Sequence, residues 1–126
     1  MIRALVLAVA VLCAMAAPAH AARFSGAYLL GLCEMDAKGH EKVKGGHAAC
    51  QAYISGVLDY HTVLQSLGIA PQVDICVPDR IGVGQLHAIV LDYLRNNKQH
   101  DSFVAAPAVT LALYGAYPCR KTGKKK

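Results

Sequence analysis

Four cysteines restrict the folds open to this chain more than any other feature. The sequence has five cysteines in 126 residues, and Cys13 falls within an apolar N-terminal stretch. The remaining four are Cys33, Cys50, Cys76 and Cys119, and an even number is typical of a disulfide framework in an oxidising compartment. We therefore predict one small domain that is cross-linked by two disulfides, for which three pairings can be drawn.

The N-terminal stretch predicts export. Arg3 precedes an apolar run over residues 4–17, and Ala19-His20-Ala21 has the small-x-small pattern of a signal peptidase site. The run is shorter than the roughly 20 residues that a membrane span needs. We expect a signal peptide over residues 1–21 and a mature domain over residues 22–119 that acts in the periplasm.

Charge is divided unevenly between the domain and the C-terminal tail. Residues 22–119 hold seven Lys/Arg and eight Asp/Glu, a net charge of −1, while residues 120–126 carry five positive charges. The tail is predicted to be a disordered, solvated end. Attraction to an acidic partner, an anionic lipid or the cell wall is the alternative. A nucleic-acid partner is not expected after export.

Hydrophobic periodicity predicts an all-α domain of four helices. The clearest stripe has apolar residues at every third or fourth position over residues 50–67, and Gly68 follows as its C-terminal cap. A shorter helix is expected to run from a Ser25 cap to Cys33. No segment alternates with a period of two for long enough to predict a strand.

Two more helices are predicted in the C-terminal half. The third covers residues 83–94, and the fourth falls within residues 103–117. Asp101 or Ser102 is expected to start the fourth helix. However, Pro107 is compatible only with the first turns of a helix, so that helix starts late or kinks.

Helix geometry favours one disulfide pairing. Cys33 ends the first helix and Cys50 lies near the start of the second, so an antiparallel hairpin brings them together. Cys76 precedes the third helix and Cys119 follows the fourth, and the same argument pairs them. We predict Cys33–Cys50 and Cys76–Cys119, within a bundle of two hairpins.

The residues predict no catalytic, metal or cofactor site. Oxidised cysteines supply no thiolate nucleophile. His40 and His47 flank a loop beside Cys33 and Cys50, but disulfide formation would remove the sulfurs from any zinc site. Both histidines are therefore interpreted as surface residues. His61, on an apolar stripe, is expected to be a core or interface residue with a satisfied nitrogen.

Three neighbouring residues of the second helix are unusual. Gly56 in a helix interior costs about 1 kcal/mol relative to alanine, which either reflects close approach of another backbone or is a tolerated weak spot. Asp59 lies off the apolar stripe, so it is either solvated or bonded to a neighbouring loop. Tyr60 also faces away from the stripe and is a candidate interface anchor.

The order and spacing of several motifs carry a family resemblance. The motifs are Gly26-x-x-Leu-Leu, Cys33, Cys50-x-x-Tyr-Ile-x-Gly-x-x-Asp59, Cys76-Val-Pro78, Gln85, Tyr93-Leu94 and Ala112-Leu-x-x-Ala-Tyr-Pro-Cys119. Together they resemble the Rap1a/Tai family of type VI secretion immunity proteins over nearly all of the mature chain. Gly82 departs from the hydroxyl N-cap common in that family, and the Lys-rich tail is not part of its pattern.

The resemblance implies a function. Proteins of this family are small, helical and periplasmic, and they protect bacteria from type VI effectors, notably peptidoglycan amidases. It implies a protein that docks on a toxin and occludes its active-site cleft without a cofactor, and it suggests a homodimer. The candidate partner-binding residues are Asp59, Tyr60, Gln72, Asp74 and Asp79, from the second helix and the loop after it.

The alternative function is that of an acid-stress chaperone of the HdeA type. Such chaperones are also small, helical, periplasmic and disulfide-bonded. They usually have one disulfide, however, and this chain has few clustered acidic residues to titrate at low pH.

Overall fold

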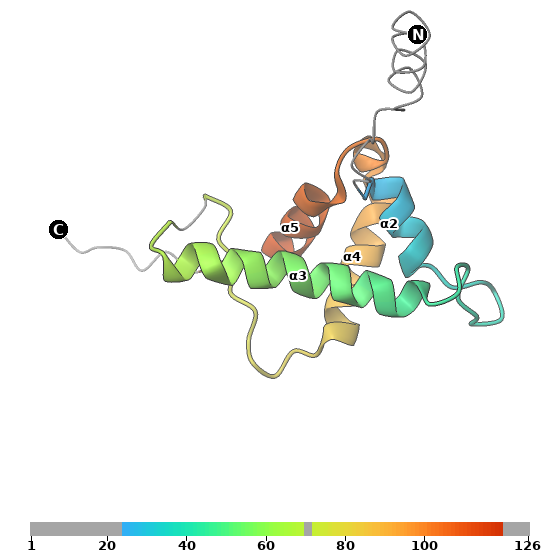
Figure 1. The fold of residues 1–126 in the computed structure, drawn as a ribbon, viewed down its shortest axis with the longest axis horizontal. Coiled ribbons are helices and arrows are strands. Elements are labelled where there is room, and N and C mark those ends of the chain that lie inside the picture. Colours follow the sequence, from blue (N-terminus) through green and yellow to red (C-terminus); the bar gives the residue numbers. More distant parts are fainter. Residues whose placement is uncertain (1–23, 70–71, 120–126) are drawn as a thin grey trace, which may run out of the picture.

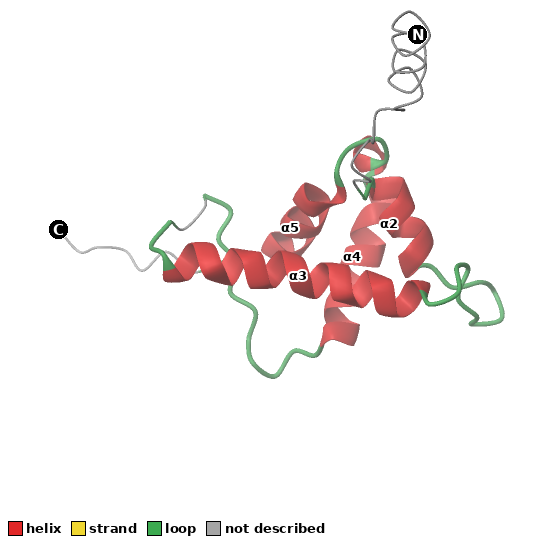
Figure 2. Cartoon of the chain, in the orientation of Figure 1, coloured by secondary structure: helices red, strands yellow, loops and turns green. Residues whose placement is uncertain are grey.

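The protein consists of helices and connecting loops throughout the part of the chain that the structure describes. The computed structural model describes residues 24–69 and 72–119, so the predicted signal peptide and basic tail lie outside it. The elements are α2 (Gly26–Cys33), α3 (Gly46–Ser66), α4 (Val83–Asn96), the 3₁₀ turn η1 (Lys98–His100) and α5 (Ala105–Ala116). The described residues form four α-helices, and Figure 2 shows no strand among them. The all-α prediction is confirmed.

Helix α3 organises the bundle. It is the longest helix and runs across the other three, and α2, α4 and α5 all pack against it (Figure 1). Helix α4 also packs against α5 and α2. The side chains that are at most 1% exposed include Leu29, Ile54, Val90, Leu94, Val109 and Leu113. Each of the four α-helices thus contributes to one core. None of these helices combines the length and the apolar character needed to cross a membrane.

The helix ends follow the expected capping. The Ser25 hydroxyl accepts a hydrogen bond from the backbone N–H of Tyr28 at 3.2 Å, which satisfies one free amide at the start of α2. At the end of α3, Gly68 has φ +71°, and the N–H of Ile69 donates to the carbonyl of Leu64 at 2.9 Å. This is a Schellman cap. The predicted caps at Ser25 and Gly68 are confirmed.

Helix α5 begins later than Asp101 or Ser102, so that expected start is wrong. The carbonyl of Asp101 instead accepts from the N–H of Ala27 at 3.1 Å, and the carbonyl of Phe103 accepts from the N–H of Gly26 at 2.9 Å. These bonds satisfy amides at the start of α2 and hold residues 101–103 out of a helix. Pro107 is the third residue of α5, where its missing N–H leaves no helical bond unmade.

Both disulfides pair as predicted. Cys33 joins Cys50, and Cys76 joins Cys119, with Cα–Cα distances of 5.2 and 4.9 Å. Backbone bonds flank the second bridge: the N–H of Cys76 donates to the carbonyl of Tyr117 at 2.8 Å, and the N–H of Cys119 donates to that of Asp74 at 2.9 Å. The loop before α4 is therefore fixed to the segment after α5.

Candidate partner interface

An apolar groove lies on the protein surface between α3 and α5. Its volume is about 830 Å³, within the range of roughly 300–1,000 Å³ that is common for binding sites. The lining residues are Ala52, Tyr53, Gly56, Val57, Tyr60, His61 and Leu64 of α3, Val73 of the following loop, and Ala106, Pro107, Thr110 and Leu111 of α5. The two helices thus form the two walls of the groove.

The spacing of the α3 residues explains this surface. They recur at intervals of three and four positions, so they share one face of the helix. Gly56 contributes no side chain, and a Cβ placed there would meet nothing within 4 Å among the described residues. No backbone of another described element therefore approaches Gly56 closely. Its missing side chain leaves room within the groove.

The groove suits an apolar ligand because most of its lining side chains are apolar. Among the residues that the structure describes, no Asp, Glu, Lys or Arg lines it. The Thr110 hydroxyl donates to the carbonyl of Ala106 at 2.9 Å. Burial raises the pKa of the Tyr53 phenol, and a hydrogen bond from the Ala106 backbone only partly offsets this. Tyr53 is thus neutral at physiological pH, and its ring adds apolar surface to the groove.

His61 forms the base of one end of the groove. It is buried, as predicted, and its Nε2 lies 3.0 Å from the amide nitrogen of Ile75 and 3.1 Å from Oδ1 of Asp74. The Gln65 side-chain amide donates to the same carboxylate oxygen at 2.7 Å. This hydrogen bond is the largest cause of a lowered pKa for Asp74, and His61 acts in the same direction. His61 and Gln65 together hold the loop that supplies Val73.

The structure brings only some of the predicted partner-binding residues to the groove. Tyr60 lines it and is 65% exposed. Asp74 lies at one end, where its Oδ1 is 3.1 Å from Nε2 of His61. Asp59, Gln72 and Asp79 are exposed but do not line the groove. They stay predictions for contacts outside it.

Sequence reasoning missed the α5 wall. The sequence analysis assigned no binding face to the fourth predicted helix, in which Val109 and Leu113 are buried. Leu111, on another face, is 39% exposed and lines the groove. The composition of α5 was the signal that could have identified this wall. Thr110 is the one polar side chain in α5 besides the hydroxyl of Tyr114. A helix that is apolar on every side buries one face in the core and leaves another apolar face that needs a partner.

Of the two histidines that were expected at the surface, His47 is partly buried. His40 is exposed, as predicted. His47 is half-buried, and its ring lies 4.4 Å from the ring of His87. It is not a surface residue, because the start of α3 packs against α4 beside the first disulfide.

Comparison with known families identifies the relationship of the chain. A family model described as Rap1a immunity proteins matches residues 25–119. The chain belongs to this family. The match runs from the Ser25 cap to Cys119, so it includes both walls of the groove and both disulfides. The Rap1a resemblance drawn from the motifs is confirmed. No curated protein and no solved structure gave a significant match.

Proposed function

We propose that this Rap1a family member is a periplasmic immunity protein that binds a type VI secretion effector through the groove between α3 and α5. The observation that carries the proposal is an apolar groove of about 830 Å³ within the family-matched residues. Two disulfides also fit an oxidising compartment. Binding alone is sufficient for this function, since a protein seated on an enzyme can block its cleft.

We expect Tyr60 to contribute more to the free energy of effector binding than the other residues of the groove. Tyrosine is enriched among the residues that dominate protein–protein affinity, because it buries a large ring with few rotatable bonds. Tyr60 stands beside the space left by Gly56. We expect an apolar side chain or segment of the effector to fill that space and pack on the Tyr60 ring. The exposed Asp59, Gln72 and Asp79 would contact the effector around this centre.

The effector that we propose is a peptidoglycan-degrading amidase. This choice rests on the resemblance to immunity proteins that protect against such enzymes. A homodimer is a further proposal on the same basis, and sedimentation of the purified protein over a range of concentrations tests it.

Co-expression tests the function. The product of a gene next to the gene of this protein is exported to the periplasm with and without the protein, and lysis is measured. We expect protection by the wild type, and lysis despite co-expression would contradict immunity against that effector. Suppression of the aggregation of unrelated proteins only at acid pH would instead support the chaperone function.

Two groove variants test the surface. Tyr60→Ala removes the proposed anchor, and Gly56→Leu fills the space beside it. Each should weaken effector binding by about thirtyfold or more, the change expected at an interface hot spot. Phe103→Ala is the matched control, because Phe103 is also 65% exposed but does not line the groove. Protection that survives in both groove variants would place the interface elsewhere.

A further inference from the structure

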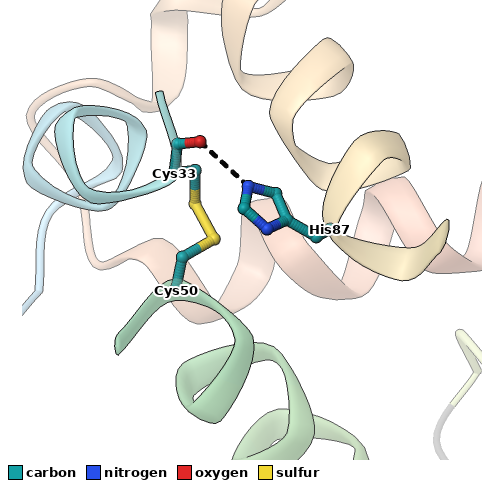
Figure 3. A group of neighbouring side chains, drawn as sticks. All are labelled: Cys33, Cys50 and His87. Carbon is teal, nitrogen blue, oxygen red and sulfur yellow. Dashed lines mark hydrogen bonds between the residues drawn. A yellow bond between two sulfur atoms is a disulfide. The ribbon is translucent and has the colours of Figure 1, made fainter. Parts of the chain in front are cut away.

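The first disulfide and a buried histidine form a group with the composition of a metal site. The sulfurs of Cys33 and Cys50 and a ring nitrogen of His87 lie within 4.8 Å of one another. They come from α2, α3 and α4, and all three residues are at most 4% exposed. Figure 3 shows that the ring edge carrying both nitrogens of His87 faces the disulfide.

The hydrogen bond to Cys33 indicates which tautomer the neutral His87 ring adopts. Its Nε2 lies 2.9 Å from the carbonyl oxygen of Cys33. A carbonyl only accepts, so Nε2 carries the proton, and in the neutral ring Nδ1 holds a free lone pair. This Nδ1 is buried and has no hydrogen-bond partner among the described residues. Metal-binding histidines commonly have this arrangement, in which one nitrogen donates to a backbone carbonyl and the other binds the ion.

A second histidine lies next to the group. The ring of His47 is 4.4 Å from that of His87, and its Nε2 lies 2.8 Å from the Gln51 side-chain nitrogen. The Nδ1 of His47 is also buried without a partner. Rotation of the Gln51 amide would present an oxygen to a protonated Nε2 and leave Nδ1 of His47 as a second free lone pair.

We propose that, when Cys33 and Cys50 are thiols, they bind one Zn²⁺ together with Nδ1 of His87, and that His47 or water is the fourth ligand. Zn²⁺ prefers a tetrahedral set of thiolate and imidazole ligands at about 2.3 and 2.0 Å, which places the ligand atoms about 3.5–3.8 Å apart. The two sulfurs and a ring nitrogen of His87 lie within 4.8 Å of one another, so small side-chain movements after the sulfur–sulfur bond opens would bring the ligands to these distances.

Both steps, reduction of the disulfide and binding of the ion, balance in atoms and electrons. Cysteines enter a new chain as thiols, so the zinc-binding form precedes the disulfide. In the oxidised protein, a trialkylphosphine and water convert the disulfide to two thiols and the phosphine to its oxide. Binding of Zn²⁺ then displaces the two thiol protons. The ion would link α2 to α3 as the disulfide does and would add α4, so this end of the bundle can be cross-linked in either redox state.

Metal binding by the phosphine-reduced, oxygen-free protein tests the proposal. Zn²⁺ is titrated against a chromophoric chelator, and Co²⁺ is added separately because tetrahedral thiolate coordination gives it strong visible absorption. We expect one Zn²⁺ per reduced chain, and none at this site in the oxidised protein. His87→Gln should weaken binding by about tenfold or more. The exposed His40→Gln is the matched control and should bind as the wild type does.

Disulfide variants separate this site from general thiol binding. Cys76→Ser/Cys119→Ser should keep the Zn²⁺ site, and Cys33→Ser/Cys50→Ser should lose it, since no group of three metal-binding residues surrounds Cys76 and Cys119 among the described residues. Far-UV circular dichroism follows folding, and Zn²⁺ should restore any helix lost on reduction. Equal binding by the two double variants, wild-type affinity in His87→Gln, or a reduced chain that stays unfolded with Zn²⁺ would overturn the proposal.

Discussion

The backbone N–H of Ile75 donates to Nε2 of His61 at 3.0 Å, so a buried imidazole of α3 holds the loop that follows that helix. Ile75 is itself buried, and Gln65 supports the same segment by donating to the Ile75 carbonyl at 3.2 Å. The end of the groove beside Val73 therefore depends on the contact between His61 and Ile75.

His61→Leu should therefore destabilise the fold. Leucine fills the space but leaves the buried amide of Ile75 without an acceptor, which costs about 1–3 kcal/mol. Urea unfolding followed by circular dichroism measures the loss. Thr62→Ala is the control: Thr62 is exposed, its hydroxyl bonds only within α3 at the carbonyl of Leu58, and its loss should change stability by less than about 0.5 kcal/mol. Equal stability of wild type and His61→Leu would show that water replaces the lost acceptor.

Local signals in the sequence were sufficient to predict the helices and the pairing of the disulfides. Periodicity located α3 and α4, and the caps at Ser25 and Gly68 depend on neighbours within five residues. The disulfide pairing needed only the order of helix ends along the chain. The start of α5 could not be predicted in this way, because the carbonyls of Asp101 and Phe103 bond to α2, which is far away in sequence.

The groove and the histidine cluster depend on how helices sit beside each other. Tyr60 was identifiable because it lies off its stripe, but Leu111 lines the groove only because α5 packs alongside α3. Likewise, nothing in the sequence pairs His47 with His87, which are 40 positions apart and meet across α3 and α4. Such contacts depend on packing between elements and leave no periodic signal in either segment.

Substitution by alanine should change the stability of the fold differently at three glycines. A Cβ at Gly46 would lie 2.8 Å from the carbonyl oxygen of Leu32, and one at Gly26 would overlap the carbonyl of His100. Gly26→Ala and Gly46→Ala should each cost about 1–3 kcal/mol, as overpacking does. Gly56→Ala should stabilise the protein by up to about 1 kcal/mol, since the site is open and alanine favours a helix. Thermal and urea unfolding of the three variants compare them. A destabilised Gly56→Ala would contradict the open site.

Asp74 should make stability depend on pH in the acid range. Its pKa is lowered from 3.8, chiefly by the hydrogen bond from Gln65 and then by His61. A carboxyl with a lower pKa in the folded state stabilises the protein fully above its unfolded pKa, and this contribution disappears as the pH falls through the folded pKa. The unfolding free energy should thus decline as the pH drops below about 4.

Asp74→Asn isolates this contribution. Glu34 and Asp36 also have lowered pKa values, so acid weakens both proteins through them. The wild type should lose more stability than Asp74→Asn between neutral pH and pH values below about 4. Urea unfolding at several pH values measures the two curves. Parallel curves would show that Asp74 has the same pKa in the folded and unfolded chains.

The two disulfides should open in a fixed order. Cys33 and Cys50 are at most 1% exposed, whereas Cys76 is exposed and Cys119 is half-buried. A reductant must reach a sulfur, so the native protein should lose Cys76–Cys119 first. Timed exposure to a phosphine, followed by alkylation and peptide mass spectrometry, identifies the free thiols. In denaturant both bridges are accessible and should open at similar rates. Earlier labelling of Cys33 and Cys50 in the native protein would mean that α2 separates from α3 more readily than the segment near Cys119 separates from the loop before α4.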